Sequence, residues 1–152
     1  MSLKSRLEKV IGGYPDKVIA LMAWLWTLPT SLLASLLIAA SAGPKKASYL
    51  FRGIVVVQPR YVWWFPKRFA GMVLGRVIIV RNINWFVPES QWEQAFVRHE
   101  LHHCEQGLYT GWLHLPLYLF ASLMAGICYG KPYRANWFEM MARLAAGQQV
   151  KP

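Results

Sequence analysis

Residues 88–107, PESQWEQAFVRHELHHCEQG, predict the helix around which the rest of the fold is arranged. Ser90 and Glu93 have the S-x-x-E spacing of a capping box, which places the start of the helix here. The side chains that then recur at helical spacing share one face: Trp92, Ala95, Phe96, His99 and His103. The charged residues of this stretch make it unsuitable as a membrane span. We therefore expect an amphipathic helix that packs on a core.

The segments on either side of this helix predict an α+β fold. SYLFRGIVVVQ (48–58) and GMVLGRVIIV (71–80) are β-branched and bounded by Gly and Pro, as strands are. YVWWF (61–65) is compatible with a third strand or with a membrane-facing aromatic loop. KPYRANWFEMMARLAAGQQ (131–149) predicts a final helix that begins near Asn136 or somewhat earlier. We expect a small antiparallel sheet packed on the 88–107 helix and on the C-terminal helix.

Composition limits the partners of the chain. In 152 residues it is 55% hydrophobic and carries a formal charge of +10. A hydrophobic and basic chain favours contact with an anionic membrane surface. Nucleic acid is an unlikely partner, because the basic residues are scattered and form no recognisable nucleic-acid-binding motif. Cys104 and Cys128 are too few for a disulfide scaffold, and the sequence leaves open whether they pair.

The charge-free run at residues 18–40 allows three interpretations. It is long enough to span or embed in a membrane, with Trp24 and Trp26 as interface anchors. It also resembles a secretory signal, because Ala40-Ser41-Ala42 has a small-x-small pattern and would give a secreted protein after cleavage near Ala42. The third interpretation is a helical hairpin folded on the domain, broken near Pro29. We divide the chain into an N-terminal amphipathic and apolar, membrane-associated segment (1–43) and a domain (44–152).

The sequence HELHH at residues 99–103 predicts a metal site. His99 and His103 are four residues apart, so they lie on the same side of a helix and can share one Zn²⁺. In an H-E-x-x-H helix the glutamate, here Glu100, takes a proton from the zinc-activated water instead of binding the metal. His102 points about 60° away from the ligand face and is expected to flank the site, with a role as ligand in place of a neighbouring histidine as the alternative. An ordinary helix with solvent-facing histidines is the alternative.

A catalytic zinc site needs a third protein ligand, and three residues are candidates. Glu105 is turned away on a straight helix, and His114 lies in an apolar run that would need a tight turn. Glu139 lies on a separate helix and is favoured, although it could instead complete the cap at Asn136 or pair with Arg143. If Glu139 is a ligand, the apolar run 111–130 cannot separate it from the histidines by a full bilayer.

The order of these segments resembles small gluzincin-type zinc metallopeptidase domains. The resemblance is carried by the strand GMVLGRVIIV, by HELHH and by a glutamate on a later helix. It is closer to a group of small, uncharacterised bacterial H-E-x-x-H proteins, through LPLYLFAS (115–122) and YRANWFEMMA (133–142). It covers about residues 70–145. It implies His99, His103 and Glu139 as zinc ligands and Glu100 as general base.

By the same analogy, the strand 71–80 would pair with an extended peptide substrate. Tyr133 and Arg134 are the nearest candidates to stabilise an oxyanion. The resulting hypothesis is a membrane-associated zinc metallopeptidase, a hydrolase of peptide bonds with Glu100 and Tyr133 as catalytic residues. The alternative is a non-catalytic basic membrane or envelope protein with a structural or vestigial metal site.

Overall fold

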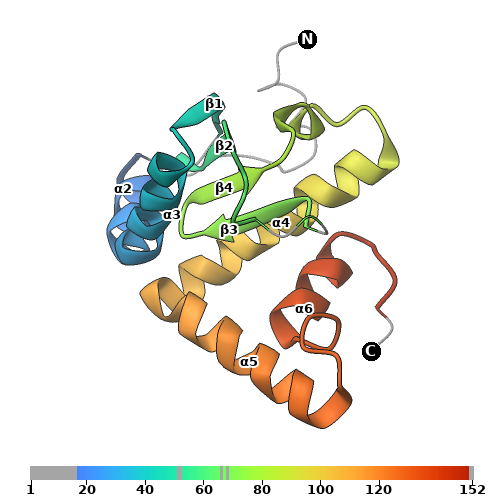
Figure 1. Ribbon diagram of the computed structural model, residues 1–152. Helices are drawn as coiled ribbons and strands as arrows, with labels where there is room; N and C mark the ends of the chain where they lie inside the picture. Colours follow the sequence, from blue (N-terminus) through green and yellow to red (C-terminus); the bar gives the residue numbers. More distant parts are fainter. Residues whose placement is uncertain (1–16, 51–52, 66, 68, 151–152) are drawn as a thin grey trace.

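The computed structural model describes residues 17–50, 53–65, 67 and 69–150, and it confirms the α+β fold class (Figure 1). The first sixteen residues, predicted to be amphipathic, lie outside the described residues. The helices and strands are α2 (Lys17–Trp26), α3 (Leu28–Ala40), β1 (Pro44–Tyr49), β2 (Val55–Pro59), β3 (Gly71–Leu74), β4 (Val77–Val80), α4 (Gln91–Thr110), α5 (His114–Tyr129) and α6 (Trp137–Ala145). Two 3₁₀ turns, η2 (Ile83–Phe86) and η3 (Gly111–Leu113), flank α4.

The four strands form a mixed sheet in the order β1-β2-β4-β3. The β1–β2 and β3–β4 pairs are antiparallel as predicted, but β2 and β4 are parallel, so the prediction of a purely antiparallel sheet is wrong for this pair. The reason is that the chain leaves β2 at Pro59 and enters the sheet again at Gly71, at the edge opposite β1. The β3–β4 hairpin then returns β4 to the side of β2. YVWWF lies between β2 and β3 and forms a loop.

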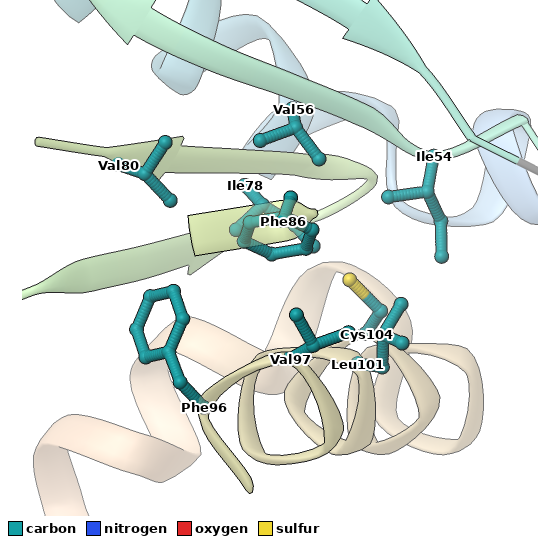
Figure 2. Close-up of a cluster of buried hydrophobic side chains, with 9 residues drawn as sticks. All are labelled: Ile54, Val56, Ile78, Val80, Phe86, Phe96, Val97, Leu101 and Cys104. Atoms are coloured by element: carbon teal, nitrogen blue, oxygen red, sulfur yellow. The ribbon is translucent and has the colours of Figure 1, made fainter. Parts of the chain in front are cut away.

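One face of the sheet packs on α4. All four residues of β4 are buried, as expected for a central strand that is covered on both faces. Val56, Ile78 and Val80 point toward α4, where they meet its apolar side chains (Figure 2). The buried residues that α4 and the preceding turn contribute to this core are Phe86, Phe96, Val97, Leu101 and Cys104. The face that the sequence predicts to pack on a core shares only Phe96 with this set, and Trp92 is 52% exposed, so that prediction is wrong in its orientation.

The opposite face of the sheet packs on α3. Val57, Val77 and Ile79 face this side and surround Ala34, which is completely buried. The β3–β4 turn lies against the start of α3, since a Cβ at Gly75 would come within 2.2 Å of Ser31 Oγ. The apolar run forms two helices, α2 and α3, as the hairpin interpretation predicts. The break between them falls at Thr27, two residues before Pro29.

The two tryptophans of the apolar run have partners inside the protein. Trp24 Nε1 donates to Gly53 O at 2.6 Å, and Trp26 Nε1 donates to Leu108 O at 3.1 Å. The Trp26 ring also lies against Gly111, where a Cβ would come within 2.2 Å of it. Gly111 has a φ of 60°, so the turn between α4 and α5 needs a glycine both for its backbone and for this contact.

Beyond this turn, α5 runs back at an angle to α4, and α6 folds into the space between them (Figure 1). By length and composition alone, the helical stretch Gln91–Tyr129 is long and apolar enough to cross a membrane. The start of α6 lies beside the middle of α5, because Asn136 Nδ2 donates to Tyr118 O at 3.1 Å and to Ser122 Oγ at 2.7 Å. Helix α6 also contacts α4 directly, because Gln106 Nε2 donates to Phe138 O at 2.9 Å, so no bilayer-thick layer separates these two helices.

Candidate metal centre

The helix that carries HELHH begins where the sequence predicts. Ser90 accepts a hydrogen bond from the Glu93 backbone N–H, and the Glu93 carboxylate accepts one from the Ser90 backbone N–H, which completes the capping box. The cap holds the start of α4, and the apolar contacts with the sheet hold its length. His99 and His103 then lie on the side of α4 that faces α6.

His99, His103 and Glu139 form a buried cluster whose ligand atoms all lie within 4.8 Å of one another. The Nε2 atoms of the two histidines are 3.2 Å apart. The Glu139 carboxylate spans this pair, with Oε1 at 3.3 Å from His103 Nε2 and Oε2 at 3.5 Å from His99 Nε2. Two ligands at about 2.0–2.1 Å from a tetrahedral zinc would be about 3.3–3.4 Å apart. The spacing of the two nitrogens therefore fits a shared metal ion.

The hydrogen bonds of the cluster also fit a metal ion. Burial alone would raise the pKa of Glu139, but its interactions with His103 and His99 outweigh it and hold the pKa well below its usual range. The carboxylate is therefore ionised. Its Oε2 atom and His99 Nδ1 are buried with no hydrogen-bond partner among the described residues. A cation bound to Oε2 would satisfy one of these two atoms.

Gln106 determines which nitrogen of His103 is available to a metal. Its Nε2 donates to Phe138 O at 2.9 Å, so its Oε1 faces His103 Nδ1 at 2.8 Å as an acceptor. His103 Nδ1 must then carry the proton, which leaves the Nε2 lone pair directed at the cluster. The same side chain ties α4 to the backbone next to Glu139. The sequence analysis missed Gln106, although its i,i+3 spacing from His103 was a usable signal.

Glu139 lies in the first turn of α6, and the cap at Asn136 fixes the start of this helix. The Asn136 side chain accepts a hydrogen bond from Phe138 N at 2.8 Å, as the sequence predicts for the start of this helix. The carboxylate of Glu139 does not complete the cap. It accepts a hydrogen bond from the Tyr118 hydroxyl at 2.8 Å and lies 3.7 Å from Arg143. The predicted pairing with Arg143 and the approach to the histidines are thus both present.

Glu100, the predicted general base, is buried beside the cluster but is not part of it. Burial raises the pKa of its carboxyl group, and the neighbouring charges of His103 and His99 oppose this rise. The backbone of Gly71 in β3 lies directly against it, because a Cβ there would come within 2.6 Å of Glu100 Oε1. The glycine leaves the carboxylate room between the helix and the edge strand.

The other candidate ligands lie outside the cluster. His102 is half-buried and lies 3.4 Å from the exposed Glu105, and neither belongs to the cluster with Glu139. His114 is buried, and its Nδ1 lies 3.1 Å from Thr110 Oγ1. Burial, together with the nearby charge of His103, lowers the pKa of His114 to about 4, so this imidazole is neutral.

Tyr133, the predicted oxyanion partner, is half-buried near Glu139. Burial and the Glu139 charge raise the pKa of its phenol, so the hydroxyl remains protonated. Its ring lies 5.2 Å from that of Phe69 and 5.0 Å from the Arg143 guanidinium. Tyr133 therefore occupies a fixed position at the edge of the cluster.

Two cavities meet at these residues. The first, which we call the apolar cavity, has a volume of about 220 Å³ and lies between β3 and α5. The second, the basic cavity, has a volume of about 810 Å³ and extends toward α6 and the end of the chain. Both are lined by Phe69, Gly71, His99, Glu100 and Tyr133. The candidate metal centre is therefore accessible from two sides.

Comparison with known proteins adds no relative: no protein-family model, no curated protein and no solved structure matches the chain. The likeness to gluzincin-type peptidases therefore rests on the residues and their geometry. What the structure supports is a possible metal site made of His99, His103 and Glu139.

Proposed function

We propose that the chain is a zinc-dependent metallopeptidase that works at a membrane surface. The observation that carries the hydrolytic part is the buried cluster of two histidines and one ionised glutamate beside a second, buried glutamate. Two histidines and a carboxylate are a ligand set used by catalytic zinc in hydrolases, and it leaves one coordination position open. Zinc held there would act as a Lewis acid on the scissile carbonyl and activate water.

The residues of the chain would supply the proton transfers and the positioning. Glu100 lines both cavities and would take a proton from the attacking water and later pass it to the leaving amine. Its raised pKa suits a group that must release a proton as well as accept one. Tyr133, with its hydroxyl protonated, would donate a hydrogen bond to the developing oxyanion.

The edge strand β3 supports a peptide as the substrate. Within the sheet β3 pairs only with β4, and residues 71–75 line the apolar cavity along its length. An extended peptide that lies along the outer edge of β3, with one side chain in this cavity, would add a strand to the sheet by backbone hydrogen bonds. The scissile bond would then lie between β3 and the histidines of α4.

Glu100→Gln tests the catalytic assignment. We expect the variant to bind one zinc per chain, as wild type does, and to lose activity on a peptide library by about 10²- to 10⁴-fold, the usual contribution of a general base. Glu105→Gln is the matched control, because Glu105 is exposed on the same helix. This substitution should leave zinc binding and peptidase activity unchanged. Equal activity of Glu100→Gln and wild type would indicate a structural metal site.

The membrane part of the proposal rests on the exposed apolar surface of the helices. Large apolar side chains are exposed along α2, α3 and α5: Leu21, Met22, Leu25, Leu32, Leu36, Leu119, Phe120, Leu123 and Ile127. Large exposed apolar surface is typical of interaction sites. The exposed Lys45 and Lys46 follow α3 and the exposed Lys131 follows α5, which suits an anionic lipid surface.

Vesicle sedimentation tests this surface. We expect binding to vesicles of phosphatidylcholine mixed with phosphatidylglycerol, weaker binding to phosphatidylcholine alone, and reduced binding for Phe120→Asn with Ile127→Asn. Binding that is the same for wild type and this double variant would contradict docking through α5.

A further inference from the structure

The two cavities that meet at the candidate metal centre differ in chemistry, and this difference bears on the substrate of the proposed peptidase. They share the residues around Glu100, so one extended ligand can occupy both. One cavity lies on the α5 side of this point, and the other lies on the α6 side. A peptide that crosses the centre would therefore place unlike residues on the two sides of its scissile bond.

The apolar cavity has the size and lining for one bulky apolar side chain. Away from the metal centre, the side chains of β3 and α5 that line it are mainly aliphatic: Met72, Val73, Leu74, Leu115 and Leu119. A cavity of about 150 Å³ holds a benzene ring, so a volume of about 220 Å³ accommodates a leucine- or phenylalanine-sized group. Leu119 lines this cavity and is also 59% exposed, so the cavity opens to the surface at this residue.

The basic cavity has an excess of positive charge. Lys131, Arg134 and Arg143 line it, whereas Glu100 is the only acidic residue among the described residues of its lining. Arg143 is already within 3.7 Å of Glu139, and Arg134 is exposed at the rim. A carboxylate placed in this cavity would meet an attractive field, and a cationic group would be repelled.

We propose that the site selects a peptide with a bulky apolar residue on one side of the scissile bond and a carboxylate on the other. The apolar residue occupies the apolar cavity, and the carboxylate lies beside Arg134 in the basic cavity. The carboxylate comes either from an Asp or Glu side chain or from the C-terminus of the peptide. This inference rests on the proposed peptidase function and adds its substrate class.

A set of soluble peptides tests the selection. The peptides have the same sequence except at two adjacent positions: one carries Leu or Ser and the other carries Glu or Gln, and each pair is made in both orders with an amidated C-terminus. A further peptide carries Leu and Gln at these positions and ends in a free carboxylate. We expect Leu to be favoured over Ser by about 10- to 200-fold in kcat/KM, as for apolar pockets generally. Glu should be favoured over Gln by about two- to fivefold, as for an exposed ion pair.

The two sources of the carboxylate are separated by the last peptide. If the side chain is the group recognised, the amidated Glu peptide is preferred. If the terminal carboxylate is recognised, the peptide with the free C-terminus is preferred, and cleavage lies close to that end. Either preference supports the proposal. Equal cleavage of all neutral and acidic peptides would overturn the proposed recognition of a carboxylate.

Variants with matched controls assign each preference to its cavity. Leu119→Asn should reduce the preference for Leu to within a few-fold, whereas Leu123→Asn should not. Leu123 lies one turn further along α5 and is also 59% exposed, but it does not line the cavity. Arg134→Gln should abolish the preference for a carboxylate, whereas Arg60→Gln, at an exposed position outside both cavities, should leave it intact.

Binding separates this inference from the proposed chemistry. Zinc-loaded Glu100→Gln should bind the fluorescently labelled Leu–Glu peptide more tightly than its Ser–Gln counterpart, even though it does not turn either over. If wild type shows the same binding preference but cleaves no peptide, the preference for an apolar residue and a carboxylate stands as a binding property, and the peptidase assignment is lost. If wild type cleaves Leu–Glu and Ser–Gln peptides at equal rates, the peptidase assignment stands and the substrate class is wrong.

Discussion

The two buried sides of α4 differ in chemistry, because one buries apolar side chains and the other buries polar and charged ones. Toward the sheet, Val97, Leu101 and Cys104 are buried against apolar strands, and the burial raises the pKa of the Cys104 thiol to about 12. Toward α6, His99 and His103 are buried against an ionised carboxylate. The first side is stabilised by removal of apolar surface from water alone. The second carries a desolvation cost that a bound cation would offset.

This comparison predicts which parts of the stability depend on metal. Changes on the sheet side of α4 should act equally in the metal-free and zinc-loaded protein. Changes on the α6 side should act mainly through metal affinity.

The largest effect is expected for Leu101→Ala. Leu101 is 6% exposed in the core between α4 and the sheet, and such a truncation costs about 2–5 kcal/mol through lost transfer free energy and the cavity left behind. Urea denaturation with zinc and with a chelator should give the same loss. Leu123→Ala, at an exposed position, should change the free energy of unfolding by less than about 0.5 kcal/mol. A loss seen only with zinc would mean that the two sides are coupled.

Removal of the metal should have the next largest effect. Zinc at about one hundred times its dissociation constant should stabilise the wild type by about 2.7 kcal/mol, since it binds the folded state. Glu139→Gln should abolish this gain, which thermal denaturation would show as a loss of the zinc-dependent shift in Tm.

The pH dependence of the zinc gain has a definite sign. Burial alone would lower the pKa of His103, but its interactions with Glu139 outweigh this and raise it in the metal-free protein. Zinc must therefore displace a proton, and the stabilisation should shrink as the pH falls below the raised pKa of His103. A gain that is constant from neutral to acidic pH would contradict binding through this imidazole.

Gln106→Leu should weaken the metal site without removing a ligand. The substitution deletes the acceptor for His103 Nδ1 and the hydrogen bond to Phe138 O, both of which hold the ligands in position. Loss of such a partner typically lowers metal affinity by 10- to 100-fold. Competition with a zinc chelator would measure this change, with Glu105→Gln as the unaffected control. Unchanged affinity would show that the tautomer of His103 is set elsewhere.

The same comparison explains what the sequence could predict. The capping box of α4 and the cap at Asn136 are local patterns, and each was recognised because its signal lies within a few residues. The approach of Glu139 to the histidines was favoured because a separate helix can bring a carboxylate to them. It followed from the metal chemistry of HELHH, not from any local pattern.

The features that were missed are set by contacts between distant segments. Strand alternation does not reveal that β4 lies parallel to β2, because the order of strands depends on the edge at which the chain enters the sheet again after β2. Gln106 acquires its role only when α6 brings Phe138 O within reach. The contact of Gly71 with Glu100 likewise depends on how the edge strand lies over the helix.

Ser90→Ala should give the smallest effect and so provides the sharpest test of independence. The Ser90 hydroxyl accepts the Glu93 N–H at 3.2 Å, and loss of such a cap typically costs about 1 kcal/mol. The cap lies at the first turn of α4, more than two turns before His99, so the loss should appear in the free energy of unfolding with and without zinc. Zinc affinity should stay at the wild-type value in a chelator competition. If affinity falls instead, the cap at the first turn helps to position the histidines, and the two sides of α4 cannot be treated as separate contributions.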